Sequence, residues 1–127
     1  MSKFVPFVLH EHHADKAGLH YDLRLRYPYK QKMASWAVRY LPDEKQKRLA
    51  IQVEDHPMSW NTFSGKIPEG SYGAGEVKIA QSGKAEILHW TKTFIVFKVE
   101  GKLLNGQYTL MKSEKIGKSS WMFIKNK

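Results

Sequence analysis

One stretch of the chain alternates strictly between apolar and polar residues: Leu19-His20-Tyr21-Asp22-Leu23-Arg24-Leu25-Arg26. Successive side chains of a β-strand point to opposite faces of the sheet, so this alternation predicts a strand over residues 19–26. The odd-numbered residues form an apolar face suited to a core. The even-numbered residues place an imidazole, a carboxylate and a guanidinium in a row, with ~6.5–7 Å between neighbouring Cα atoms.

The remainder of the chain also consists of short apolar runs separated by turn residues, and no long stretch keeps the 3.6-residue period of a helix. The pattern predicts strands over residues 4–9, 19–26, 33–39, 48–54, 75–80, 84–90, 94–100, 107–112 and 120–125. We therefore expect one all-β domain over residues 1–127. Its predicted form is a small closed β-barrel of about eight strands, with a polar central cavity and one or two short helices.

Glycine positions suggest where these strands turn. Ser82-Gly83 and Asn105-Gly106 have the composition of tight hairpin turns, because glycine accepts the positive φ that such turns need. Residues 42–48 form the one segment that favours a short helix, with Asp43 as its candidate N-cap.

Composition limits the partners and the chemistry. The 127 residues include 21 Lys and Arg against 12 Asp and Glu, a net charge of +9 that favours nucleic acid first and an anionic membrane second. A basic protein with no such partner is the alternative. The absence of cysteine excludes a disulfide scaffold, thiolate zinc sites and cysteine nucleophiles. No apolar run has the length of a signal peptide or a membrane span, so we expect an intracellular, cytoplasmic protein. We also expect a monomer without a membrane partner.

The polar face of residues 19–26 has the donor set of a metal site. Imidazole and carboxylate from His20 and Asp22 suit Mn²⁺, Fe²⁺ or Zn²⁺, but a third ligand is needed. His12 is the best upstream candidate, and His10 and His13 flank it. The planar fork of Arg24 matches two oxygens of a phosphate, and a metal beside an arginine is what a phosphoester needs. A surface strand with an Asp–Arg pair and an idle histidine is the alternative.

A second polar face precedes Pro57, where Glu54 and His56 share one side of the strand over 48–54. If this face meets the first, His56 could bind phosphate or donate a proton to a leaving oxygen, and Glu54 could orient a metal-bound histidine. Alternatively, His56 only closes a turn. The glycine-rich segment 67–75 matches no phosphate-binding loop and favours a backbone role, while Trp60 either packs or stacks on a base or sugar.

Taken together, these pieces resemble the 3′-phosphoesterase domain of bacterial ligase D and its stand-alone archaeal and bacterial relatives. The matching segments, which follow the family's order over nearly the whole chain, are 4–9, 11–14, 19–25, 35–38, 47–50, 53–57, 67–75 and 121–125.

The resemblance implies a small β-barrel with a polar cavity and a Mn²⁺-dependent activity on 3′ ends, with Co²⁺ or Zn²⁺ as other candidate metals. Such enzymes trim a 3′-terminal ribonucleotide and then remove the 3′-phosphate, which implies DNA or RNA-tipped primer ends as substrates and a separate ligase or polymerase as a partner. The matching positions imply that His12, His20 and Asp22 hold the metal. They also imply that Arg24 and His56 contact phosphate and act in catalysis, with Glu54 as a supporting carboxylate.

The chain departs from the family pattern at three places. The loop between Ala14 and His20 is longer than usual, so His10 or His13 could compete with His12. A lysine that commonly follows the 35–38 segment is missing, and Arg39 is the candidate to replace its charge at the phosphate. Trp60 stands where many members have tyrosine and offers no hydroxyl.

Two other functions compete with the phosphoesterase. His20, Asp22 and His56 together resemble the two-His-one-carboxylate triad of non-haem Fe(II) oxygenases, although Arg24 suits an anion better than dioxygen. The net charge and the aromatic residues also allow a non-catalytic module that binds DNA ends.

Overall fold

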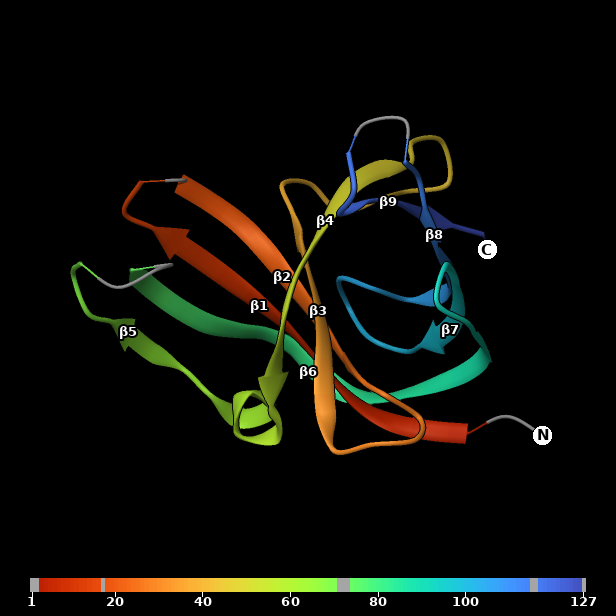
Figure 1. The fold of residues 1–127 in the computed structure, drawn as a ribbon, viewed down its shortest axis with the longest axis horizontal. Helices are drawn as coiled ribbons and strands as arrows, with labels where there is room; N and C mark the ends of the chain where they lie inside the picture. The colour runs from red at the N-terminus through yellow and green to blue at the C-terminus, as the bar shows by residue number, and fades with distance from the viewer. Residues whose placement is uncertain (1–2, 17, 71–73, 115–116, 127) are drawn as a thin grey trace.

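The computed structural model describes residues 3–16, 18–70, 74–114 and 117–126. Over these residues the regular structure is β-strand apart from one short 3₁₀ helix, which confirms the predicted all-β class. The strands are β1 (Lys3–Ala14), β2 (Gly18–Arg26), β3 (Lys32–Val38), β4 (Arg48–Pro57), β5 (Gly65–Ile67), β6 (Gly75–Trp90), β7 (Phe94–Val99), β8 (Gly106–Lys112) and β9 (Ser120–Lys125) (Figure 1). The 3₁₀ helix η1 (Met58–Thr62) directly follows β4.

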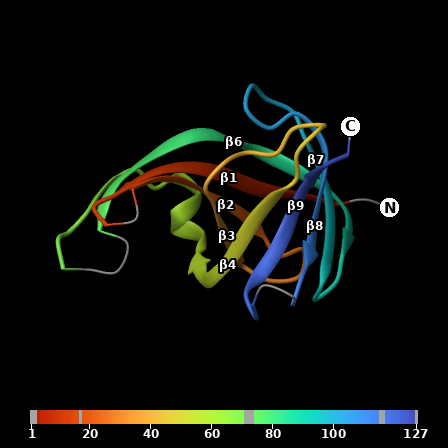
Figure 2. The same ribbon diagram turned by 90° about the horizontal axis from the view of Figure 1, so that it is seen from above.

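Backbone hydrogen bonds join eight of the described strands into a ring. Its order is β1-β2-β3-β4-β9-β8-β7-β6, and β6 pairs back onto β1. Each of these pairings is antiparallel. The short β5 pairs with the other edge of β6. Seen from above, the long strands β1 and β6 arch over η1 and β4 (Figure 2). The pairing of β6 with β1 closes the ring, which confirms the predicted barrel-like closure.

The ring encloses an apolar core to which all eight of its strands contribute. Three aromatic side chains lie at its centre, where the rings of Phe97, Tyr108 and Phe123 have centroids 5.5–6.2 Å apart. Burying a side chain of this size contributes ~1.5–3 kcal/mol or more, so this cluster is a main source of stability. Its other members are Val5, Phe7, Leu9, Leu23, Leu25, Ala34, Trp36, Val38, Ala50, Ala85, Ile87, Ile95, Val99, Leu104, Leu110 and Trp121.

The strand alternation divides β1 and β2 between this core and the opposite face. Leu9 lies opposite Leu23 and points into the core, whereas the next pair, His10 and Asp22, points to the other side. The polar cavity therefore lies on the face of β1 to β4 that looks away from the core. A polar cavity at the centre of the ring is not what the structure has, because alternation sends the apolar residues of every ring strand to that centre.

Two predicted hairpin turns differ from the structure. Residues 75–90 form one continuous strand, in which Gly83 lies opposite Phe7, so the prediction of a turn at Ser82-Gly83 is wrong. Pairing with the long strand β1, which runs on to Ala14, keeps this segment extended. Asn105-Gly106 is not a two-residue turn either, because Val99 pairs with Gly106 and residues 100–105 form the connection.

The predicted helix over residues 42–48 is absent. The Asp43 carboxylate accepts hydrogen bonds from the backbone N–H groups of Lys45 and Gln46, both at 2.8 Å, which stabilises a local turn. An Asp side chain that bonds to nearby backbone N–H groups stabilises such a turn in place of a helix. The segment also lacks an apolar face that would pack a helix against the core. Within the described part of the chain, no helix is long and apolar enough to cross a membrane.

Candidate active site

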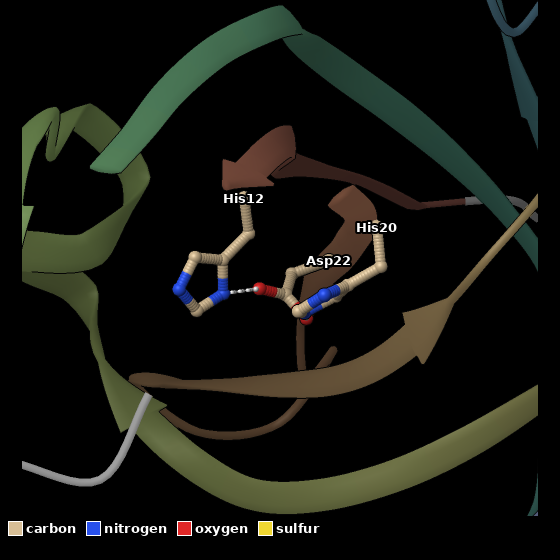
Figure 3. A group of neighbouring side chains, drawn as sticks. All are labelled: His12, His20 and Asp22. Atoms are coloured by element: carbon tan, nitrogen blue, oxygen red, sulfur yellow. Dashed lines mark hydrogen bonds and ion pairs between the residues drawn. The ribbon is translucent and has the colours of Figure 1, made fainter. Parts of the chain in front are cut away.

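Strands β1 and β2 bring together the three residues predicted as metal ligands. His12 lies opposite His20 in the antiparallel register, and Asp22 is one pair along on the same face. One ligand atom from each residue lies within 4.8 Å of the other two, and the three side chains converge (Figure 3). Two imidazoles and one carboxylate form a donor set that suits a divalent transition metal, so these residues fit such an ion.

Hydrogen bonds hold the three side chains in this arrangement. His12 Nδ1 lies 3.1 Å from Asp22 Oδ2, and His20 Nε2 lies 3.4 Å from Oδ1 (Figure 3). Burial opposes ionisation of Asp22, but the hydrogen bonds from both histidines and the charge of Arg24 outweigh it and hold the pKa of Asp22 well below its usual value. The carboxylate is therefore ionised, as a metal ligand must be.

Arg24 lies next to this group and is almost fully buried. Its Nη2 lies 3.5 Å from Asp22 Oδ2, its Nη1 lies 3.3 Å from His56 Nδ1, and its Nε donates to His10 Nδ1 at 3.1 Å. Burial lowers the pKa of Arg24, an effect that the Asp22 charge opposes, and the guanidinium stays protonated. A buried guanidinium in a fixed orientation, next to residues that could hold a metal ion, is well suited to bind an anion.

His10 fixes the orientation of Arg24, a role that the sequence did not predict. Its Nε2 lies 2.8 Å from the carbonyl oxygen of Phe63. Because Arg24 Nε must donate to Nδ1, the proton of the neutral ring sits on Nε2 and is donated to Phe63. Burial and the Arg24 charge lower the pKa of His10 to about 4, which keeps it neutral. The sequence indicates that His10 and His12 lie on the same face of β1. The structure, which places His12 opposite His20, shows which of them joins His20 and Asp22.

His56 completes this polar cluster from β4. It lies opposite Met33 just beyond an irregularity in the β3–β4 pairing, and its Nδ1 also lies 3.4 Å from Ser35 Oγ. Burial and the charge of Arg24 lower its pKa, so the ring is mainly neutral at pH 7. Nδ1 accepts from Arg24, which places the proton on Nε2. His56 thus stands with Arg24 and outside the metal group, so the predicted oxygenase triad of His20, Asp22 and His56 does not form.

Trp60 of η1 covers the cluster. The Arg24 guanidinium lies 4.8 Å from the centroid of its ring, and the His56 ring meets it edge-on at 4.7 Å. Phe63 packs on it at 4.6 Å. These contacts favour packing over base stacking as the role of Trp60. A cation over a tryptophan face is stabilised by ~0.5–2 kcal/mol, so Trp60 helps to hold Arg24 in place.

The remaining predicted residues are more exposed than the cluster, and the charge and backbone of Glu54 both act on His56. Glu54 and Arg39 are exposed and line the same cleft as the metal group. His13 points away on the exposed face of β1, where it bonds to Glu11 at 2.6 Å. The parity of the strand therefore excludes His13 as a rival to His12. Of the glycine-rich segment, Ile67 and Pro68 line the cleft, and residues 71–73 lie outside the described residues.

The cleft has a volume of about 1150 Å³ and two kinds of wall. The metal group, Arg24 and His56 form one end. Apolar side chains of β4, Ile51 and Val53 among them, form another wall. Four further cations line it: Arg39, Lys47, Arg48 and Lys66. This cleft has the size and the positive charges to accommodate an extended anionic ligand.

The fold and the site define a small all-β protein that holds a candidate divalent-metal group beside a buried arginine. Residues 10–112 match the family model described as DNA Ligase D 3′-phosphoesterase domain. The chain therefore belongs to this family, which confirms the predicted resemblance.

Three relatives are similar over most of the chain. The Multifunctional non-homologous end joining protein LigD of Pseudomonas aeruginosa is 39% identical over 126 residues, which cover 89% of the chain and 14% of the relative. The LigD proteins of Mycobacterium tuberculosis and Mycolicibacterium smegmatis are 38% and 36% identical over 117 and 125 residues. These matches cover 84% and 85% of the chain but only 14% and 15% of the relatives, so the chain spans about a seventh of their length.

Proposed function

We propose that the protein is a metal-dependent phosphoesterase that heals the 3′ ends of nucleic acids. It removes 3′-terminal ribonucleotides as a phosphodiesterase and 3′-phosphates as a phosphomonoesterase, and it leaves a 3′-hydroxyl for repair or ligation. Membership of the 3′-phosphoesterase family supports this proposal, as does similarity to relatives whose names place them in non-homologous end joining. A separate DNA ligase or polymerase is the partner that such a healed end requires.

The proposal rests on one contact, between the candidate metal site and the candidate anion site. Asp22, one of the three candidate metal ligands, has its Oδ2 3.5 Å from Nη2 of Arg24, the candidate anion-binding residue. We propose Mn²⁺ as the cofactor, held by His12, His20 and Asp22, with Co²⁺ or Zn²⁺ as substitutes. When bound, such an ion supplies a Lewis acid that polarises a phosphoryl oxygen.

The chain's own residues provide the rest of the phosphate site. The guanidinium of Arg24 donates to phosphate oxygens while His10 holds its Nε edge. His56 carries its proton on Nε2 and donates it as a hydrogen bond to another phosphate oxygen. A bound phosphate dianion raises the pKa of this ring, so that it can take up a second proton and then, as the imidazolium, protonate the leaving oxygen and return to the neutral form.

Residues at the rim hold the strand. Arg39 contributes charge to the phosphate site where the family commonly has a lysine, and Lys47, Arg48 and Lys66 line the same cleft. Contacts to phosphates do not read sequence, so these cations accept any 3′ end and their binding weakens with salt. Glu54 is the proposed supporting carboxylate at the mouth of the cleft.

The test follows product from a primer with a 3′-phosphate and from one with a 3′-terminal ribonucleotide, each with Mn²⁺. We expect release of inorganic phosphate from the first and of the ribonucleoside from the second. His20→Ala and Arg24→Ala should each reduce the rate by about 100-fold or more, which is the scale of losing one electrostatic contact to the transition state. His13→Ala is the matched control, since this histidine is exposed and lies on the face of β1 opposite the ligand His12.

Unchanged rates in both site variants would show that the activity does not use this site. Tight binding of the primer without product, under any divalent metal, would favour a non-catalytic module that binds DNA ends.

A further inference from the structure

A row of three side chains crosses the floor of the cleft, starting at the candidate metal group. Asp22 of β2 lies opposite Ala37 of β3, and Ala37 lies opposite Ile51 of β4. All three residues line the cleft. Neighbouring strands of a sheet lie ~4.8 Å apart, so the Cα of Ile51 is about 10 Å from that of Asp22. The middle residue is an alanine, which leaves room above it for a ligand that reaches from the metal group to β4.

The far side of this floor is an apolar platform, which we define by Tyr40, Leu49 and Ile51. These side chains are 62%, 42% and 37% exposed, and all three line the cleft. Leu49 and Ile51 are two residues apart on β4, so they share one face of the strand. Apolar surface that is open to water is stabilised when a ligand covers it. The platform therefore favours a ligand with an apolar face.

Positive charge flanks the platform. The guanidinium carbon of Arg48 lies 5.3 Å from the centre of the Tyr40 ring, and Arg48 Nε donates to the carbonyl oxygen of Leu41 at 3.2 Å. These two contacts hold the cation against the ring, which fixes the ring at the edge of the platform. Three further cations line the same cleft: Arg39, Lys47 and Lys66. An apolar surface among cations suits a ligand that joins a flat apolar group to phosphates.

We infer that the apolar platform binds the base of the nucleoside whose 3′ oxygen carries the reacting phosphate. With the phosphate at Arg24 and the metal group, the sugar lies over Ala37 and the base reaches the platform. Such side chains contact the face of a base and not its hydrogen-bonding edges, so the platform accepts all four bases. The inference rests on the proposed function, from which it takes the position of the phosphate. It adds that a 3′ end without a base binds poorly.

The experiment measures the equilibrium binding of fluorescent primers by anisotropy, without divalent metal so that no product forms. All primers end in a 3′-phosphate. The first is intact, the second has a tetrahydrofuran abasic residue as its last nucleoside, and the third has the same abasic residue at an internal position. Phosphate release from the intact primer with Mn²⁺ is measured separately and reports on the proposed function.

We expect loss of the last base to weaken binding about fivefold or more, and loss of the internal base to change it little. Tyr40→Ala and Ile51→Thr should each weaken the intact primer about threefold or more and leave the primer with the terminal abasic residue nearly unchanged. Tyr40→Phe keeps the ring and should bind as the unaltered protein does. The matched controls are Tyr29→Ala and Ile79→Thr, at an exposed tyrosine and an exposed isoleucine that do not line the cleft.

Three results would overturn the inference. The first is equal binding of the intact and terminal abasic primers, or no binding of either. The second is an equal loss of both primers in the platform variants, which would place the strand backbone there. The third is an equal loss in the platform variants and their controls. Phosphate release with Mn²⁺ but no preference for the terminal base refutes the platform alone, whereas a preference without phosphate release refutes only the proposed activity.

Discussion

Replacing His10 with alanine should destabilise the protein by about 2–5 kcal/mol. His10 has no solvent exposure and bridges two groups, Arg24 Nε at 3.1 Å and the Phe63 carbonyl at 2.8 Å. Its removal leaves a buried charged donor without a partner, which costs ~1–3 kcal/mol or more, and a half-buried carbonyl near the lower end of that range. Loss of the ring also opens a void beneath Trp60, whose ring centroid is 6.2 Å away.

The matched replacement is His10→Gln. A glutamine amide has an oxygen that can accept from Arg24 and an N–H that can donate to Phe63, so it restores both hydrogen bonds. We expect it to cost less than about 1 kcal/mol. His13→Ala, on the exposed face of the same strand, should change stability by no more than ~0.5 kcal/mol.

The assay is urea unfolding of the three variants, followed by far-ultraviolet circular dichroism at constant pH and salt without divalent metal. The predicted loss for His10→Ala is a large part of the ~5–15 kcal/mol that stabilises a typical domain, so the midpoint should shift clearly. Equal losses for alanine and glutamine would show that ring shape, and not hydrogen bonding, explains the role of His10. A loss no larger than that of His13→Ala would refute the role altogether.

Three further predictions concern pH, metal and backbone. The pKa of His10 falls from 6.5 to about 4 on folding, so between these pH values the unfolded chain binds one proton more than the folded protein. The free energy of unfolding should therefore decline as the pH drops from about 6.5 to about 4. His10→Gln should flatten this part of a plot of urea midpoint against pH. Mn²⁺ at 100 times its Kd should stabilise the protein by ~2.7 kcal/mol in thermal melts, and His20→Ala should abolish this gain while His13→Ala keeps it. Gly75→Ala should cost more than about 2 kcal/mol in urea unfolding, because φ is +142° and a Cβ would lie 2.1 Å from the His13 carbonyl oxygen; Gly83→Ala, where the nearest atom is a side-chain carbon at 3.6 Å, should cost less.

Much of the site could be predicted because β2 alternates so strictly. The period of two predicts His20, Asp22 and Arg24 on one face, and the structure has them there. Its failure at His10 has a physical reason. Parity puts His10 and His12 on the same face, and the β1–β2 register places His10 opposite Asp22 and His12 opposite His20. Only the side-chain directions show that His12 bonds to Asp22 and His10 to Arg24.

Errors in the predicted fold arose where distant contacts outweigh local preference. Gly83 has the composition of a turn and a φ of +153°, which L side chains rarely adopt, yet it lies opposite Phe7 within the long β1–β6 ladder. No residue near Gly83 indicates that partner. The cavity was likewise expected in the centre of the ring, since alternation separates two faces but does not say which one a closing sheet turns inward.

The charges of the buried cluster are complementary to those of the proposed substrate, a phosphate monoester. His10 and His56 are mainly neutral because burial and Arg24 lower their pKa values, so the fixed charges are one carboxylate, Asp22, and one guanidinium, Arg24. They cancel, and a divalent ion on the metal group would bring the site to +2. A 3′-phosphate carries close to −2 at pH 7, because its second pKa is ~6, and it neutralises this charge. Arg24→Gln, which keeps hydrogen-bond donors but lowers the total to +1, should therefore weaken the binding of a 3′-phosphorylated primer, with Mn²⁺ present, more than that of the same primer with a 3′-hydroxyl. If Arg24→Gln weakens the binding of both primers equally, the charge of Arg24 interacts with the strand in general and not with its terminal phosphate.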